Sequence, residues 1–185
     1  MLFRSVLWNS SGYEGEETLE ILSHFVDVYL PDLKTLDKDF SSRFFNALDY
    51  PDQTAAAILK MIKQKELRFN GEVMVQGVMI RHLVIPGFLE STRKVLSWFK
   101  NNVSKGTALL SLMTQYTPVN NSEKETPGRY VSSEEYDAVI SMLEEFGIDD
   151  GFCQELVTGS DWLPDFTKQN PFSSELSEPV WFWRQ

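Results

Sequence analysis

The chain has 185 residues, enough for one well-packed domain, and its 42% apolar and 13% aromatic content is typical of soluble globular proteins. Its formal charge of −10 disfavours nucleic acids and anionic membranes as partners, because their phosphates would be repelled. The single Cys153 excludes an intrachain disulfide and a metal site made only of cysteines. No segment reaches the length of a membrane span and no cleavage pattern follows the start, so we expect a cytosolic protein without membrane or nucleic-acid partners.

Short apolar runs alternate with longer segments of helical period along the chain, a pattern typical of parallel α/β sheets. Strands are predicted at residues 2–8, 25–30, 78–85 and 108–113. Helices are predicted at residues 15–24, 37–46, 52–66, 91–102 and 133–146. Ser132 or Ser133 suits the N-cap of the last helix, with Glu135 close behind, and Gly147 suits its end.

We expect one β/α domain over residues 1–150 and an irregular tail over residues 151–185. The tail is rich in proline and aromatic residues, so we predict that it packs aromatic side chains over the domain. Cys153, within this region, is predicted to be a small, buried apolar side chain. No repeat or linker indicates a second domain.

The predicted sheet is short of strands, since four are few for a barrel or an open α/β sheet. The chain also opens directly on the apolar run at residues 2–8. An unpaired apolar edge strand favours association. We therefore expect this strand to form a homodimer by pairing with a second copy, or to follow further strands.

Polar residues stand at the carboxyl end of every predicted strand, where parallel sheets bind their ligands. Asp32 and Lys34 are two residues apart, so both can project from one face toward a common pocket. A solvated turn after the strand is the more frequent explanation of such a pair. The strand ends at Asn9 and Gln115 also have an ordinary structural explanation, as a turn and a strand exit.

Arg81 and His82 lie inside an apolar strand, and a buried guanidinium needs a counter-charge, a ligand or a cavity. Neighbouring residues of a strand face opposite sides. We predict that Arg81 points to the ligand side near Asp32 and that His82 lies under the helices as a hydrogen-bonded core histidine. A structural ion pair of Arg81 with Asp27 or Asp32 is the alternative to a ligand contact.

Four segments, in this order and at these spacings, resemble the radical S-adenosylmethionine proteins, specifically the pyruvate formate-lyase activating enzyme-like branch: NSSGYE, VDVYLPDLK, VMIRHLVIPG and SLMTQY. The resemblance runs from about Leu7 to Gly147, and residues 162–172 also resemble that branch. Its members have a partial (β/α)6 barrel. The fold implied is α/β, an incomplete parallel β/α barrel whose roughly four βα units resemble the last four of that barrel.

The resemblance implies a [4Fe-4S] cluster that cleaves S-adenosylmethionine to a 5′-deoxyadenosyl radical, which takes hydrogen from a glycine of a partner, a glycyl radical enzyme. By position, Asn9 lies where relatives often have an acidic residue facing the cofactor. Asp32 and Lys34 match an Asp-x-Lys after the fourth strand, Arg81 matches the arginine of the fifth, and Gln115 lies where some relatives have histidine. Asp32 would hold the cofactor's ammonium group and Arg81 its carboxylate.

The chain departs from this family in two segments. The cluster is bound there by three cysteines in a CxxxCxxC motif, and Cys153 is the single cysteine here, so the chain cannot bind a cluster in that way. The glycine-rich segment that meets the cofactor's amino group is absent as well. We therefore expect no radical chemistry from this chain alone, either as the C-terminal part of a longer enzyme or as a fragment that has lost the reaction.

Two other functions stay open. The first is a non-catalytic interaction module, a degenerate barrel that docks a partner or dimerises through its first strand or its aromatic tail. The second is a Schiff-base lyase or aldolase with Lys34 as the nucleophile. It is the least favoured, because the adjacent carboxylate of Asp32 keeps the amine protonated.

Overall fold

The computed structural model describes residues 5–118, 126–157, 159 and 167. Five helices and six strands follow one another in these ranges: β1 (Leu7–Ser10), α1 (Glu16–Leu22), β2 (Val28–Pro31), α2 (Lys38–Phe45), α3 (Tyr50–Gln64), β3 (Arg68–Asn70), β4 (Val73–Leu83), α4 (Leu89–Asn102), β5 (Leu109–Met113), α5 (Ser133–Phe146) and β6 (Gly151–Cys153). None of these helices is long and apolar enough to cross a membrane.

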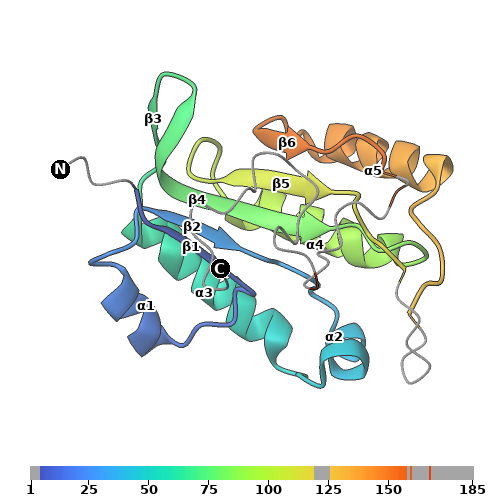
Figure 1. The fold of residues 1–185 in the computed structure, drawn as a ribbon, viewed down its shortest axis with the longest axis horizontal. Helices are drawn as coiled ribbons and strands as arrows, with labels where there is room; N and C mark the ends of the chain where they lie inside the picture. Colours follow the sequence, from blue (N-terminus) through green and yellow to red (C-terminus); the bar gives the residue numbers. More distant parts are fainter. Residues whose placement is uncertain (1–4, 119–125, 158, 160–166, 168–185) are drawn as a thin grey trace.

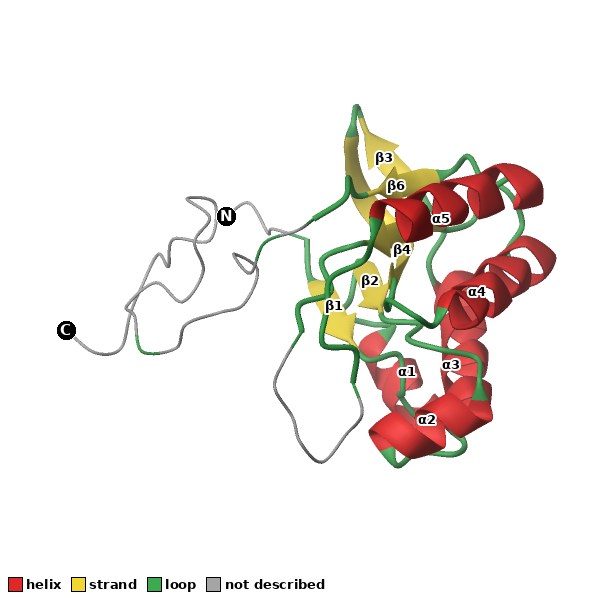
Figure 2. Ribbon diagram, turned by 90° about the vertical axis from the view of Figure 1, so that its right-hand side faces the viewer, coloured by secondary structure: helices red, strands yellow, loops and turns green. Residues whose placement is uncertain are grey.

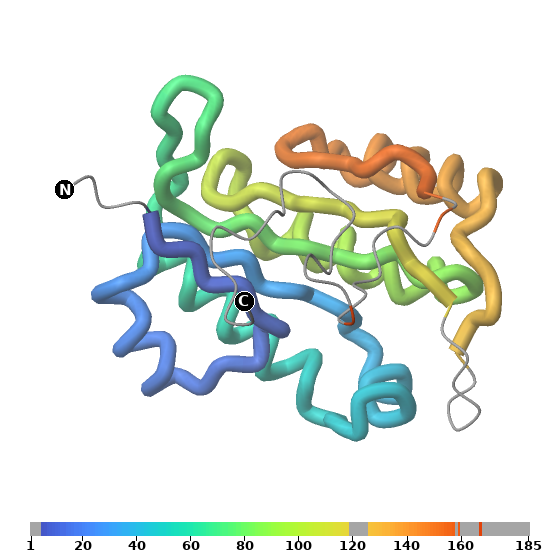
Figure 3. The backbone as a smooth tube through the Cα atoms, viewed as in Figure 1, coloured from blue at the N-terminus to red at the C-terminus, as the bar shows by residue number. Residues whose placement is uncertain are grey.

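The strands form one sheet in the order β1-β2-β4-β5-β6, with every neighbouring pair parallel, and β3 pairs antiparallel with β4 (Figure 1). Strands β1 and β6 lie at opposite edges of this sheet (Figure 3). The five helices lie on one side of it (Figure 2). We call the other side, which no described helix covers, the open face. The α/β fold with an incomplete parallel barrel, predicted from the sequence, is confirmed.

Alternation along β4 separates the core from the open face. Val78, Ile80 and His82 are almost completely buried beneath the helices, as are Tyr29 of β2 and Leu112 of β5. The residues between them on β4, such as Arg81, are only partly buried. This pattern follows from the period of two along a strand, because successive side chains leave the sheet on opposite sides.

The five predicted helices are all present, and their ends differ from the prediction by no more than two residues. Helix α5 begins with a capping box, in which the Ser132 hydroxyl accepts from the Glu135 backbone N–H and the Glu135 carboxylate accepts from the Ser132 N–H. Gly147 ends the helix in the left-handed conformation, with φ of 60°. These caps are local signals, which is why the sequence alone located this helix correctly.

The strands differ more from the prediction, because strands depend on distant partners. β1 begins at Leu7, where pairing with Val28 starts, and continues to Ser10 rather than ending at residue 8. β4 begins at Val73, five residues early, because it forms a hairpin with β3 around Gly71, whose φ is 62°. A glycine at the first of two turn residues is a recognised hairpin signal. The sequence analysis missed it.

The predicted irregular tail is wrong at its start, because residues 151–153 form β6 beside β5. Cys153 in this edge strand is exposed, which corrects the expectation of a buried side chain. The ladder brings Gly151 so close to β5 that an added Cβ would lie 2.0 Å from the carbonyl oxygen of Leu110. The expected packing of residues 160–166 and 168–185 lies outside the described residues.

His82 satisfies both ring nitrogens within the core, as predicted. Nδ1 lies 2.7 Å from the carbonyl oxygen of Leu33 and Nε2 lies 3.0 Å from the hydroxyl of Thr92 on α4. Burial lowers the pKa of His82 from 6.5 to about 4, against the smaller opposing effects of the Leu33 carbonyl and the Asp32 charge. The ring is therefore neutral in the folded protein at neutral pH.

Gly151→Ala should destabilise the protein by at least about 2 kcal/mol, because the methyl group collides with backbone and the φ of 144° disfavours any side chain. Chemical denaturation measures the change. Gly128→Ala is the matched control, since a Cβ there meets nothing within 4 Å. Equal stability of the two variants would contradict the close approach of β6 to β5.

Stability should fall as the pH drops from 6.5 toward 4, because the unfolded chain protonates His82 in this window and the folded protein does not. The loss attributable to His82 amounts to about 3 kcal/mol. Denaturation across this range should show a flatter profile for His82→Gln than for the natural chain. His24→Gln, which changes an exposed histidine, should keep the pH dependence of stability that the natural chain shows. An equally flattened pH dependence in His24→Gln would contradict the attribution to His82.

Candidate functional site

A cavity of about 440 Å³ lies on the open face at the carboxyl ends of β2, β4 and β5. Six of its lining residues carry polar groups, namely Asp32, Lys34, Arg81, Gln115, Tyr116 and Thr117. Phe45, Leu83, Ile85 and Met113 give it an apolar wall. Its size and mixed lining are those of a small-molecule site, and it lies where parallel sheets place their ligands.

Asp32 is the centre of charge in this cavity. Its Oδ2 lies 2.6 Å from Nζ of Lys34, and its Oδ1 lies 2.6 Å from Nη2 of Arg81. The sheet sets this arrangement, because Asp32 and Arg81 are paired residues of neighbouring parallel strands, and the Leu33 N–H donates to the Arg81 carbonyl at 2.8 Å. Lys34, two residues after Asp32, leaves the chain on the same side.

The counter-charge of Arg81 is thus Asp32, one of the two carboxylates predicted. Asp27, the other, instead accepts from the Val6 N–H at 2.8 Å. Asp32 and Arg81 expose only 21% and 25% of their side chains, so their pairing is less screened by water than a surface ion pair. This pairing accounts for the cation inside an apolar strand.

Asn9 connects the outer strand β1 to this pair, since its side-chain oxygen accepts from Nη2 of Arg81 at 2.5 Å. One buried polar atom of this group keeps unused capacity, because Arg81 Nε has no hydrogen-bond partner among the described residues. Buried polar atoms without partners are costly, and an arriving ligand can satisfy them.

Gln115 lies on the far wall, after β5. Its side-chain oxygen accepts from the amide nitrogen of Gln154 at 3.0 Å, and the Gln154 oxygen accepts from the Thr114 N–H at 2.9 Å. The structure therefore brings Asp32, Lys34, Arg81 and Gln115 to one cavity, with Asn9 bound to Arg81. Their roles in binding stay predictions.

Tyr50 supports the site and was missed by the sequence analysis, because its partners lie far away in the chain. Its buried hydroxyl lies 2.9 Å from the carbonyl oxygen of Ser11 and 2.8 Å from that of Asp32, and it accepts from the Lys34 N–H at 3.1 Å. Burial raises the pKa of Tyr50 to about 12, so the phenol keeps its proton. One hydroxyl thereby joins the ends of β1 and β2.

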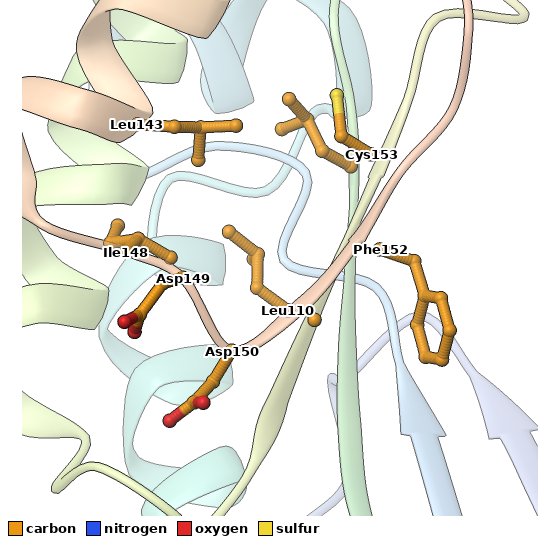
Figure 4. Close-up of a pocket in the computed structure, with 9 residues that line it drawn as sticks. Leu110, Leu143, Ile148, Asp149, Asp150, Phe152 and Cys153 are labelled. Atoms are coloured by element: carbon orange, nitrogen blue, oxygen red, sulfur yellow. The ribbon is translucent and has the colours of Figure 1, made fainter. Parts of the chain in front are cut away.

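A second, smaller cavity of about 170 Å³ lies on the helix side, between β5, β6 and α5 (Figure 4). Leu110, Leu143 and Ile148 face it, whereas Asp150 points away. Partial desolvation by its neighbours raises the pKa of the Cys153 thiol, which keeps it protonated and poorly nucleophilic. No group of three or more potential metal-binding side chains occurs in the part of the chain that the structure describes.

Comparison with known proteins shows which fold this chain shares, and it does not establish an activity for the chain. No family model matches the chain. An uncharacterised protein of Methanocaldococcus jannaschii is 31% identical over 147 residues, which is 78% of this chain and 39% of that protein. The chain therefore spans well under half the length of this relative.

A solved structure, a domain of pyruvate-formate lyase-activating enzyme from Bacteroides vulgatus, has a similar fold, with a TM-score of 0.51. The match covers 76% of this chain and 74% of the domain at 15% sequence identity. Similarity at this level shows the shared arrangement of strands and helices, and function has to be argued from the site.

Tyr50→Phe should lower the free energy of unfolding by about 1–3 kcal/mol, because it removes one buried hydroxyl that serves three backbone groups. Urea denaturation measures the loss. Tyr13→Phe is the matched control, since that exposed hydroxyl contacts only the Asp49 carboxylate, and its loss should cost less than about 0.5 kcal/mol. Equal losses would contradict the supporting role of Tyr50.

Proposed function

We propose that the cavity at the carboxyl ends of β2, β4 and β5 binds the amino-acid end of S-adenosylmethionine. The chain would thus supply a cofactor-binding part of a radical S-adenosylmethionine protein of the activating type. One observation carries the proposal: a buried carboxylate, Asp32, stands between two cations, Lys34 and Arg81, at the ligand-binding edge of the sheet. The shared fold with an activating-enzyme domain supports it.

The charges in this cavity suit a zwitterion. A ligand ammonium group can bind Asp32 and the side-chain oxygen of Asn9, both of which are acceptors. A ligand carboxylate can bind Lys34 and the guanidinium of Arg81, whose Nε has no described partner. The sulfonium and the nucleoside would then extend along the apolar wall of the cavity.

The cluster that similar proteins use does not fit the residues of this chain. Cluster ligation needs several thiolates, and Cys153, the single cysteine, lies in β6 on the wall of the other cavity. The proposal for this chain is therefore binding of S-adenosylmethionine alone, without a radical step or a glycine target. Lys34 is also a poor nucleophile, because its ammonium group is held 2.6 Å from Asp32.

Isothermal titration with S-adenosylmethionine tests the proposal. Asp32→Asn and Arg81→Lys should each weaken binding by about 10-fold or more, because each removes a charge-assisted or forked contact to the zwitterion. Asp149→Asn is the matched control, since it makes the same charge change at an exposed pair with Lys105, and it should bind as the natural chain does.

A second ligand distinguishes binding of the amino-acid end from binding of the nucleoside. 5′-Methylthioadenosine lacks both charges of the zwitterion, so Asp32→Asn should leave its binding unchanged within about 2-fold. Absence of S-adenosylmethionine binding by the natural chain would overturn the proposal. An equal loss for both ligands would show that Asp32 holds the cavity's shape rather than the ammonium group.

A further inference from the structure

The outer edge of β1 has hydrogen-bonding groups available for another strand. Among the described strands, β1 pairs only with β2. The carbonyls of Val6 and Ser10 accept from β2, through the N–H groups of Val28 and Asp32. Backbone groups alternate between the two edges of a strand, so Leu7 and Asn9 direct their N–H and C=O groups to the outer edge.

This edge also lacks the usual protection against pairing. Residues 6–10 read VLWNS, without the lysine, proline or inward-pointing charge that natural edge strands use. Val6 and Leu7 are 47% and 56% exposed, which is high for apolar side chains in a sheet. The edge therefore offers both backbone groups and apolar contacts to an added strand.

The charge around β1 indicates which kind of strand can pair with its outer edge. Residues 5–31 contain no lysine or arginine and five carboxylates, at Glu14, Glu16, Glu17, Glu20 and Asp27. Three lysines lie near this segment: Lys60 pairs with Glu16 and Glu20, Lys63 lines one cavity with Glu14 and Glu16, and Lys65 donates to the Ser23 carbonyl. Five carboxylates against three lysines leave a net negative charge. Two copies meeting edge to edge would bring two such acidic segments together, and like charges suppress pairing. A basic strand would be attracted.

We propose that the outer edge of β1, which no described strand covers, binds a β-strand of a basic partner polypeptide by extending the sheet. The bound strand would lie beside Asn9, whose side chain already contacts Arg81 in the cavity. Partner binding would therefore add a wall next to the candidate site. The proposal does not depend on the nature of the cavity's ligand, so its test uses none.

The test uses an eight-residue peptide of alternating valine and lysine with the ¹⁵N-labelled chain. Amide hydrogen exchange should slow by about 10-fold or more at Leu7 and Asn9, because these N–H groups gain acceptors. Two control peptides should fail to protect them: one with alternating valine and glutamate, and one with the same lysines but N-methylated at alternate backbone positions. The N-methylated peptide keeps the charge and loses the ability to pair.

Matched variants separate strand pairing from general attraction. Leu7→Lys places a cation on the edge and should weaken binding of the lysine peptide by about 10-fold, whereas Ile21→Lys should change it by less than about 3-fold. Ile21 suits the comparison because it is an apolar residue on α1 with a similar exposure of 64%. Circular dichroism checks that both variants fold.

Three results would overturn the proposal. Equal binding of the N-methylated peptide would mean attraction without strand pairing. Equal weakening by Leu7→Lys and Ile21→Lys would place the peptide away from β1. Protection of the Leu7 and Asn9 amides in the peptide-free chain that rises with protein concentration would identify a second copy as the occupant.

Discussion

The ion pair between Asp32 and Arg81 is the interaction on which the carboxyl edge of the sheet depends. Removing Asp32 would leave Arg81 as a largely buried charge without a counter-charge, which costs far more than a surface pair contributes. Removing Arg81 would leave Asp32 with Lys34 as its counter-charge. The backbone of Asp32 has partners of its own, because its N–H donates to Ser10 of β1 and its carbonyl accepts from Tyr50 of α3. Strand β1 and helix α3 thus converge on this residue, in addition to strand β4, which carries Arg81.

Arg81 and His82 show how a strand divides adjacent residues between stability and binding. His82 is on the helix side, where burial keeps it neutral and Leu33 and Thr92 occupy both ring nitrogens, so it has nothing left to offer a ligand. Arg81 is on the open face, where its Nε has no hydrogen-bond partner among the described residues. The difference comes from the period of two along the strand, not from the residue types.

Local signals explain what the sequence predicted correctly. The capping box at Ser132 and the glycine after α5 act within a few residues. The end of an apolar run located Asp32 and Lys34, and a charge inside another apolar run located Arg81. Tyr50 could not be found this way, because its role depends on strand ends 16 to 39 residues away. β6 was not predicted for the same reason. Three residues are too short to show the alternation of a strand, and they form one only by pairing with β5.

Polar groups without described partners occur at two neighbouring places, the outer edge of β1 and the guanidinium of Arg81 in the cavity. Asn9 belongs to the first and contacts the second. Its backbone belongs to the outer edge of β1, and its side chain contacts the guanidinium whose Nε has no described partner. Folded proteins satisfy nearly all their buried polar groups, so the buried Nε of Arg81 indicates that a ligand binds in the cavity. The edge groups of β1 are exposed, and an added strand would replace their water partners with backbone partners. A strand at the edge and a zwitterion in the cavity would therefore lie on two sides of the same residue, Asn9.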